Sequence, residues 1–183
     1  MTIPNALTLL RILLTPFLVW LLLDGRLTEA LIVFITAGVT DGLDGLSARI
    51  FHQKTKLGAY LDPLADKLLL VSSFILLGRL GLLPNWLVVI VVSRDAIILL
   101  GVLTLMFHQV SIEIKPSLLS KLTTLFQLLT IFTILGSSQV ILPTWVSFIL
   151  FGFTVAFTMA SGLQYILMGI RLFDNRRTSE NSH

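Results

Sequence analysis

The chain has 183 residues, of which 55% are hydrophobic and only 13% are charged. Its mean hydropathy is +0.94, whereas a soluble domain of this size carries roughly a quarter charged residues. There is too little polar surface to cover a water-soluble globule, so the composition indicates a membrane protein with one domain. The formal net charge of +3 is small, and the absence of cysteine excludes thiolate metal ligands.

Six apolar runs, each close to the length that crosses a bilayer, follow one another along the chain. Polar or helix-breaking segments separate them, and polarity does not alternate within them, so we expect helices and not barrel strands. The first run has no basic segment before it and no small-residue cleavage site after it. We therefore interpret it as a retained span and not as a signal peptide. The expected spans are roughly 7–23, 28–48, 58–78, 85–107, 119–137 and 143–170.

The lysine and arginine residues predict the orientation of these spans. With six spans both chain ends share one side of the membrane, and ten basic residues fall on that side against two on the other. The positive-inside rule then places both termini in the cytoplasm. We predict an all-α integral membrane domain with six transmembrane helices over residues 1–173, and a polar C-terminal tail over 174–183. The ten residues are Arg11, Arg49, Lys54, Lys56, Lys67, Lys115, Lys121, Arg171, Arg176 and Arg177.

Four aspartates lie at the cytoplasmic ends of the second and third expected spans. Each would cost about 2.5–3.5 kcal/mol at mid-bilayer, so they must face water, a cation, or both. Asp41 and Asp44 share one stripe of a helix, and Asp62 and Asp66 share one stripe of the next. A short connection between the two helices allows them to return side by side. The spacing therefore predicts that the two acidic stripes face each other.

Oxygen ligands without histidine or cysteine favour hard cations such as Mg²⁺, Mn²⁺ or Ca²⁺. Four carboxylates suit a two-metal site, in which ions about 3.5–4 Å apart hold a phosphoryl group in transit. Gly45, Ala48 and Gly58 lie on the same stripes. They are either helix-packing residues or positions that leave room for a bulky ligand. Arg49 is placed to pair with a pyrophosphate as well as to anchor its helix at the membrane surface.

These residues form a recognisable pattern. The run Asp41-Gly-Leu-Asp44-Gly45-Leu-Ser-Ala48-Arg49 is followed, after eight residues, by Gly58-Ala-Tyr-Leu-Asp62-Pro-Leu-Ala-Asp66. It resembles the signature of the CDP-alcohol phosphatidyltransferases at all eight fixed positions. The opening segment from Ile3 to Arg11 and the six-span layout are also similar to that family, so the resemblance covers nearly the whole chain.

The resemblance implies a phospholipid-synthesising enzyme that moves a phosphatidyl group from CDP-diacylglycerol to an alcohol. The four aspartates would hold two Mg²⁺ or Mn²⁺ ions, and Asp66 would also act as general base. The alcohol hydroxyl would attack the β-phosphorus, and CMP would leave. The family is typically dimeric, and we expect a homodimer in a bacterial inner membrane, with the site facing the cytoplasm and no nucleic-acid partner. The residues expected to hold the donor are Gly45, Ala48, Arg49, Gly58, Asn5 and Thr8.

The signature specifies the donor and leaves the alcohol open. The N-terminal segment and the chain length resemble the phosphatidylglycerophosphate synthases, so glycerol-3-phosphate is the first expectation. The alternative is phosphatidylglycerol, because the segments around Arg94-Asp95 and from Lys115 to Gln127 resemble eukaryotic-type cardiolipin synthases. Arg94 and Lys121 are the expected acceptor contacts. Arg94 with Asp95 also fits a structural ion pair, and Lys121 also fits a helix anchor.

Two other classes use buried acids. A UbiA-type prenyltransferase pairs aspartate motifs to bind a magnesium diphosphate, but it needs more spans, and its first motif differs from the one between Asp41 and Gly45. An ion-coupled transporter would place its charges near the midplane and show symmetry between its halves. Here the acids gather at one face, which favours the enzyme.

Overall fold

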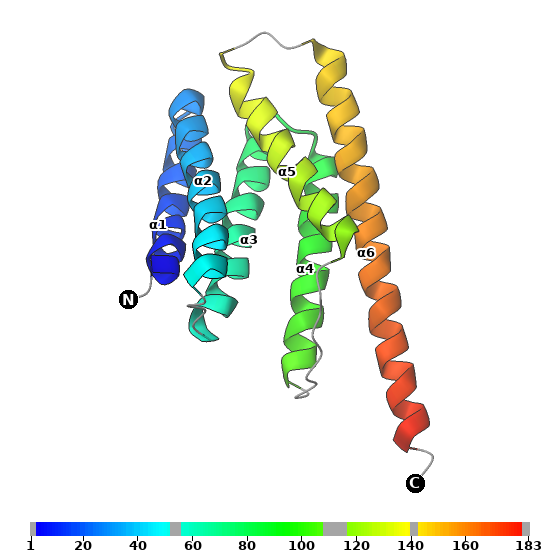
Figure 1. The fold of residues 1–183 in the computed structure, drawn as a ribbon. Helices are drawn as coiled ribbons and strands as arrows, with labels where there is room; N and C mark the ends of the chain where they lie inside the picture. The colour runs from blue at the N-terminus through cyan, green and yellow to red at the C-terminus, as the bar shows by residue number, and fades with distance from the viewer. Residues whose placement is uncertain (1–2, 52–55, 108–116, 140–142, 181–183) are drawn as a thin grey trace.

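The computed structural model describes the backbone of residues 3–51, 56–107, 117–139 and 143–180, and the side chains of 8–42, 64–101, 117–139 and 143–168. The described chain is all-helical, with helices at the six places where the apolar runs predict them (Figure 1). The all-α class is therefore confirmed. The helices are α1 (Ile3–Leu23), α2 (Leu27–Phe51), α3 (Lys56–Arg79), α4 (Asn85–Phe107), α5 (Leu118–Gly136) and α6 (Thr144–Glu180).

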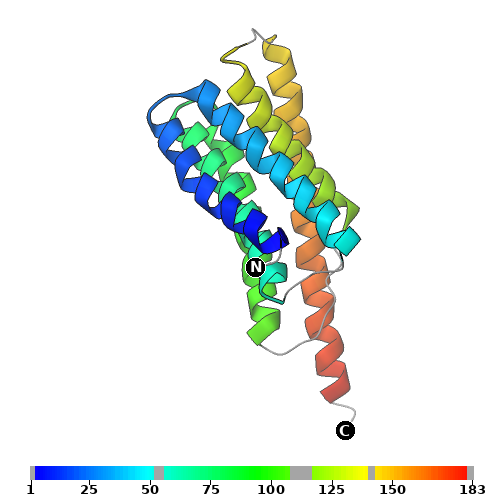
Figure 2. The same ribbon diagram turned by 60° about the vertical axis from the view of Figure 1, so that its left-hand side comes forward.

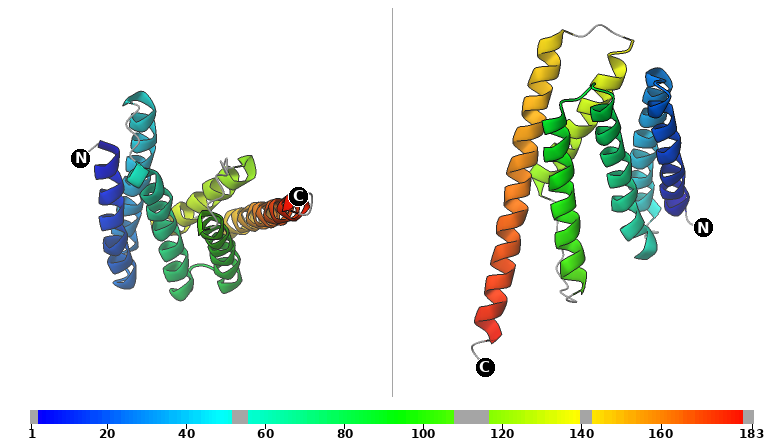
Figure 3. Two further views of the ribbon diagram at one scale, coloured as in Figure 1. Left: turned by 90° about the horizontal axis from the view of Figure 1, so that it is seen from below. Right: turned by 180° about the vertical axis from the view of Figure 1, so that it is seen from behind.

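The helices run alternately up and down as one bundle (Figure 2). α1 packs against both α2 and α3, α4 packs against α3 and α6, and α5 contacts α2, α3 and α6. Seen along the bundle, α1 and α2 form one edge and α4 and α6 the other, with α3 and α5 between them (Figure 3). The first turn of α1 and the last turn of α6 lie at the same end of the bundle (Figure 1).

Two tight turns of one kind close the opposite end. Gly25 follows α1 and Gly81 follows α3, with φ values of 74° and 72° that favour glycine. At the first turn the Arg26 N–H donates to the Leu21 carbonyl at 2.9 Å, which is the bond of a Schellman motif that spans more residues. The same pair of backbone bonds recurs around Gly81. Glycine at these two positions thus lets consecutive helices reverse direction within a few residues.

The polar and apolar side chains are distributed as a lipid environment requires. Charged and hydroxyl side chains are buried among the helices, together with a leucine-rich core. Large apolar side chains are exposed on every helix, whereas a soluble monomer rarely exposes large contiguous apolar patches. This surface fits contact with lipid tails. Examples are Leu13 on α1, Ile32 on α2, Ile75 on α3, Leu100 on α4, Phe132 on α5 and Phe148 on α6.

By length and hydropathy, two segments of the described chain could cross a membrane, Leu118–Gly136 and Thr144–Met168, and the apolar segment Thr8–Leu23 is shorter. The six-span arrangement and the side of the termini stay predictions. One boundary differs clearly from expectation, because α6 continues to Glu180, ten residues beyond the expected end at 170. The reason is local, since no glycine or proline between 171 and 180 interrupts the helix.

A close approach of α3 and α4 gives a first prediction. A Cβ added at Gly78 would lie 2.7 Å from Cγ2 of Val88, so Gly78→Ala must force the two helices apart. We expect it to lower the free energy of unfolding by about 1–3 kcal/mol. The matched control is Gly152→Ala on α6, where an added Cβ meets nothing within 4 Å. Alanine there should leave stability unchanged or raise it by about 1 kcal/mol, because it forms helix better than glycine.

The measurement is reversible unfolding of the detergent-solubilised chain by titration with sodium dodecyl sulphate, followed by circular dichroism. Equal stability of the two alanine variants would contradict the close helix approach at Gly78.

Candidate active site

Two of the predicted acidic residues converge on one buried arginine. Arg11 of α1 places Nη2 at 2.7 Å from Oδ1 of Asp41 on α2, and its Nη1 donates to Oδ1 of Asp66 on α3 at 2.5 Å. The contact with Asp41 joins opposite charges without the alignment of a hydrogen bond. The Arg11 side chain is 1% exposed, and those of Asp41 and Asp66 are 49% and 39% exposed. We call these three residues the Arg11 cluster.

The Arg11 cluster explains how the first three helices are held in register. A buried guanidinium without an anionic partner costs several kcal/mol, so α1 can bury Arg11 only where carboxylates meet it. α2 and α3 supply one carboxylate each, from the stripes that the sequence predicts to face each other. The position of Arg11 along α1 therefore determines which turns of α2 and α3 lie beside it.

A small cavity of about 80 Å³ opens beside the Arg11 cluster. Its walls come from α1, α2, α3 and α5, and apart from the cluster they are mostly apolar. The space is large enough for water or a small ligand group next to the two carboxylates. The other lining residues are Ala37, Gly38, Leu69, Leu70, Thr124 and Leu128.

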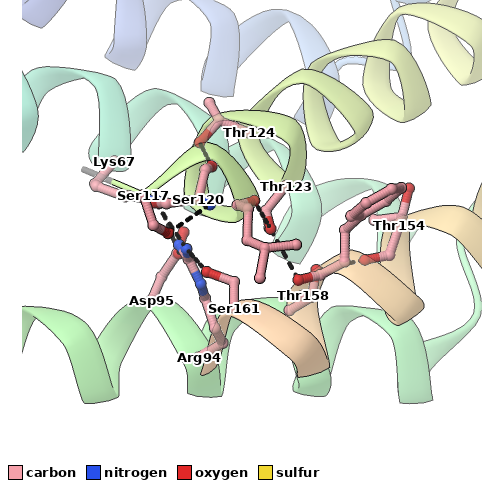
Figure 4. A network of polar contacts seen from close by, with 12 residues as sticks. Lys67, Arg94, Asp95, Ser117, Ser120, Thr123, Thr124, Thr154, Thr158 and Ser161 are labelled. Atoms are coloured by element: carbon pink, nitrogen blue, oxygen red, sulfur yellow. Dashed lines mark hydrogen bonds and ion pairs between the residues drawn. The ribbon is translucent and has the colours of Figure 1, made fainter. Parts of the chain in front are cut away.

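A second buried ionic network begins at the next residue of α3 (Figure 4). Lys67 Nζ and Arg94 Nη1 both donate to Oδ1 of Asp95, each at 2.7 Å. Nη2 of Arg94 also donates to Oγ of Ser120 on α5 at 3.0 Å and to Oγ of Ser161 on α6 at 2.6 Å. Two cations share one carboxylate, so the network carries net positive charge where α3, α4, α5 and α6 meet.

The contacts of Arg94 bear on its two interpretations, a structural ion pair and an acceptor contact. Its side chain is 5% exposed and lies over the ring of Tyr165, with 5.9 Å between the guanidinium carbon and the ring centre. The ion pair with Asp95 that the sequence allows is present. The role of Arg94 in acceptor binding stays a prediction.

Lys121, the other expected acceptor contact, lies on an exposed part of α5. It lines an open groove of about 350 Å³ together with Ser120, Thr124, Leu125 and Leu128. Thr124 and Leu128 also line the cavity beside the Arg11 cluster. One turn of α5 therefore separates the surface groove from the acidic cavity.

Asp41 and Asp66 thus meet at Arg11. Among the described residues α2 and α3 pack on α1 and α5 and not on each other, so the predicted return of the third helix beside the second is not seen there. Thr8 is buried one turn before Arg11 on α1. The side chains of the remaining predicted residues lie outside the described parts of the chain, and their roles stay predictions. These residues are Asn5, Asp44, Gly45, Ala48, Arg49, Gly58 and Asp62.

The described acids fit a hard divalent cation. Arg11 contacts one oxygen of Asp41 and one of Asp66, so both carboxylates lie at the same place in the bundle. Carboxylate oxygens are also the ligands that Mg²⁺ and Mn²⁺ prefer. Within the described side chains no three acidic, histidine or cysteine groups gather at one point. Asp44 and Asp62 would therefore have to complete a metal site.

Arg11 is not among the predicted site residues, because it is one of the ten basic residues assigned to the cytoplasmic side. Lys67 follows Asp66 but lies off its stripe, and it forms an ion pair with Asp95. A signal was present in the case of Arg11, because it lies inside the first expected span, 7–23. A charge within a span needs an oppositely charged partner, and the aspartates of the next two spans are the available acids.

Comparison with known proteins identifies the family of this chain. The sequence model of the family described as CDP-alcohol phosphatidyltransferase matches residues 1–160. The chain belongs to this family. The resemblance inferred from the two aspartate runs is therefore confirmed.

Relatives within the family carry two names. The chain is 38% identical over 161 residues to the "Probable cardiolipin synthase (CMP-forming)" of Drosophila melanogaster, covering 79% of this chain and 48% of that protein. It is 36% identical over 146 residues to the cardiolipin synthase (CMP-forming) of Rattus norvegicus, covering 71% and 48%. It is 30% identical over 187 residues to the CDP-diacylglycerol–glycerol-3-phosphate 3-phosphatidyltransferase of Bacillus subtilis, covering 89% and 92%. The chain thus spans about half the length of the two animal relatives and most of the bacterial one.

The second network gives a prediction about stability. Asp95→Ala would leave Arg94 and Lys67 without their shared carboxylate in a buried position. We expect a loss of about 3–5 kcal/mol in the free energy of unfolding. The matched control is Glu29→Ala, which removes the partner of Arg26 in a pair whose side chains are both 45% exposed. That change should lower the free energy of unfolding far less, because exposed ion pairs contribute little to stability.

The comparison uses the same detergent-based unfolding titration for both variants. A loss for Asp95→Ala no larger than that for Glu29→Ala would contradict a buried network centred on Asp95.

Proposed function

We propose that this protein catalyses metal-dependent transfer of a phosphatidyl group from CDP-diacylglycerol to an alcohol, with release of CMP. The observation that carries the proposal is the meeting of Asp41 of α2 and Asp66 of α3 at Arg11, beside a cavity and within the family's aspartate pattern. The reaction needs charge stabilisation around a pyrophosphate and a base for the attacking hydroxyl. Carboxylates that hold metal ions would serve the first need, and a carboxylate that accepts the hydroxyl proton would serve the second.

Asp66 is the general base in this proposal. Its carboxyl is 39% exposed and lines the cavity, so it can accept a proton from an alcohol hydroxyl that enters there. Asp41, Asp44, Asp62 and Asp66 would hold two Mg²⁺ or Mn²⁺ ions. When bound, these ions would neutralise the pyrophosphate and the departing CMP.

The donor would lie along the cytoplasmic ends of α1, α2 and α3. Gly45, Ala48 and Gly58 would give the nucleotide close access to the helix backbones, and Arg49 would pair with a phosphate. Asn5 and Thr8 on α1 are the remaining proposed donor contacts. The attack on the β-phosphorus would then occur between these residues and Asp66.

For the acceptor we favour phosphatidylglycerol over glycerol-3-phosphate, which reverses the order expected from chain length. Two observations support this choice. The animal relatives are named cardiolipin synthases, and the groove on α5 combines leucines with Lys121 and reaches the acidic cavity across one helical turn. A lipid acceptor needs such an apolar approach and a cation for its phosphate. The relative from Bacillus subtilis, matched over most of its length, supports the second candidate, glycerol-3-phosphate.

We also infer six membrane spans with both termini in the cytoplasm, in a bacterial inner membrane, and a homodimer as is typical of the family. The apolar side chains exposed on all six helices and the shared end of α1 and α6 support the six spans. The exposed Trp20, Trp86 and Trp145 lie near the helix ends opposite those termini, where an interfacial aromatic belt is expected. The excess of basic residues on the other side supports a cytoplasmic site.

The reaction is tested with purified full-length protein, CDP-diacylglycerol, Mg²⁺ or Mn²⁺, and one of the two acceptors. We expect CMP release when metal and phosphatidylglycerol are both present, and mass spectrometry should identify cardiolipin as the lipid product. Asp66→Asn should lower the rate by at least about 10²-fold, the usual contribution of a general base, while CDP-diacylglycerol still binds. Asp24→Asn, at the opposite end of the bundle, is the matched control and should keep the parent rate.

Formation of phosphatidylglycerophosphate from glycerol-3-phosphate, without cardiolipin, would select the second acceptor. CMP release at the parent rate by Asp66→Asn would remove Asp66 as the base. No CMP with either acceptor would refute the proposed reaction.

Topology can be tested directly because the chain has no cysteine. Ser138→Cys lies in the turn after α5, and Ser179→Cys lies near the end of α6. In intact cells a membrane-impermeant maleimide should label the first and not the second, and cell disruption should make the second reactive. Labelling of Ser179→Cys alone in intact cells would invert the proposed orientation, and labelling of both would contradict six spans.

A further inference from the structure

Arg11 occupies the space between two carboxylates that the proposed function assigns to metal ions. Its Nη1 and Nη2 lie 2.5 Å and 2.7 Å from Oδ1 of Asp66 and of Asp41. A divalent cation that binds these carboxylates draws on the negative charge of the same two side chains, because Mg²⁺ needs oxygen ligands at about 2.0–2.1 Å. The guanidinium and the metal therefore compete for the same two groups.

The burial of Arg11 makes this competition electrostatically strong. The side chain is 1% exposed, so neither water nor dissolved ions screen its charge well. A fixed positive charge near a cation site weakens cation binding by Coulomb repulsion, and the effect grows as the surroundings become less polar. Without any cation, the same charge offsets the repulsion between Asp41 and Asp66.

The contact geometry also indicates that Arg11 can exchange these partners. Its approach to Asp41 lacks the alignment of a hydrogen bond, and its Nε has no hydrogen-bond partner among the described residues. A guanidinium offers five N–H donors, and the described contacts use few of them. Arg11 is thus held mainly by charge, which a divalent cation at the same carboxylates would replace.

We propose that Arg11 is an internal counter-cation: it holds Asp41 and Asp66 together when no divalent ion binds them, and it lowers the affinity of the site for such ions. The inference rests on the metal-dependent function proposed for this site. Arg11 is a positioning residue here, because it acts through the two carboxylates. The site would consequently bind and release its cations more readily than four bare aspartates would.

The test compares Mn²⁺ binding by Arg11→Gln, Arg11→Lys and the parent, using the full chain in detergent. Electron paramagnetic resonance of free Mn²⁺ gives the dissociation constant without any substrate. Arg11→Gln removes the charge and should bind Mn²⁺ about tenfold more tightly or better, whereas Arg11→Lys keeps the charge and should stay near the parent. Arg26→Gln removes the same charge from an exposed ion pair with Glu29 and should also match the parent.

Thermal unfolding supplies a second readout. In the presence of a chelator, Arg11→Gln should melt at a lower temperature than the parent, because its carboxylates lack their counter-charge. Added Mn²⁺ should then raise its midpoint by more than it raises that of the parent or of Arg26→Gln. A structural role alone would lower the midpoint without tightening Mn²⁺ binding.

The outcomes separate the two proposals. If the parent binds Mn²⁺ and Arg11→Gln binds it no more tightly, the counter-cation inference fails and the metal-dependent function stands. If the parent binds no divalent ion, both fail. Should Arg11→Gln not fold, nuclear magnetic resonance of ¹⁵N-arginine in the parent replaces it, with Arg11 assigned by its loss in Arg11→Lys. Its Nη signals should shift or broaden as Mg²⁺ is added while those of Arg26 do not, and unchanged Arg11 signals at saturating Mg²⁺ would overturn the inference.

Discussion

The fold depends on one charge interaction, the contact of a fully buried arginine with carboxylates from two other helices. Arg11 cannot be buried without an anion, and Asp41 and Asp66 cannot approach each other without a cation. Both requirements are met only when α1 lies against both α2 and α3, as it does. The same contact that orders the first half of the bundle therefore assembles the candidate site.

The second half of the bundle repeats this principle with different chemistry. Asp95 is shared by Lys67 and Arg94, and hydroxyl groups from α5 and α6 complete the arginine's contacts (Figure 4). α3 belongs to both halves, because Asp66 and Lys67 are consecutive and point to different partners. Buried ion pairs and hydroxyl groups thus join the helices beside a leucine-rich core, while large apolar side chains also cover the outside of the bundle.

The sequence predicts the helices well because each depends on local information. The six apolar runs locate the six helices within a few residues except at the end of α6, and the spacing of the acids places Asp41 and Asp66 on the helix faces that meet at Arg11. It does less well for pairings that depend on tertiary contact. The position of Arg11 inside the first expected span indicates that it needs an acidic partner, but only the packing of α1 against α2 and α3 shows which aspartates it meets. Lys67 and Asp95 are 28 residues apart, and only the packing of α3 on α4 joins them.

The end of α6 and the acceptor show two further limits of the sequence. The polar composition after 170 indicates a change of environment, but nothing in it breaks a helix, and α6 continues to Glu180. The surroundings of Arg94 come from α3, α4, α5 and α6, and Lys121 lines a groove on α5. Arg94 and Lys121 are visible in the sequence, but their surroundings are not.

The thin wall formed by Thr124 and Leu128 has a consequence for how a lipid substrate would travel. For a molecule whose acyl chains lie along α5, the turn that carries these two residues would separate the headgroup from the carboxylates. Such a substrate would enter sideways while its tails remain in the leaflet. Turnover would then depend on its mole fraction among the surrounding lipids, and not on any concentration in the aqueous phase.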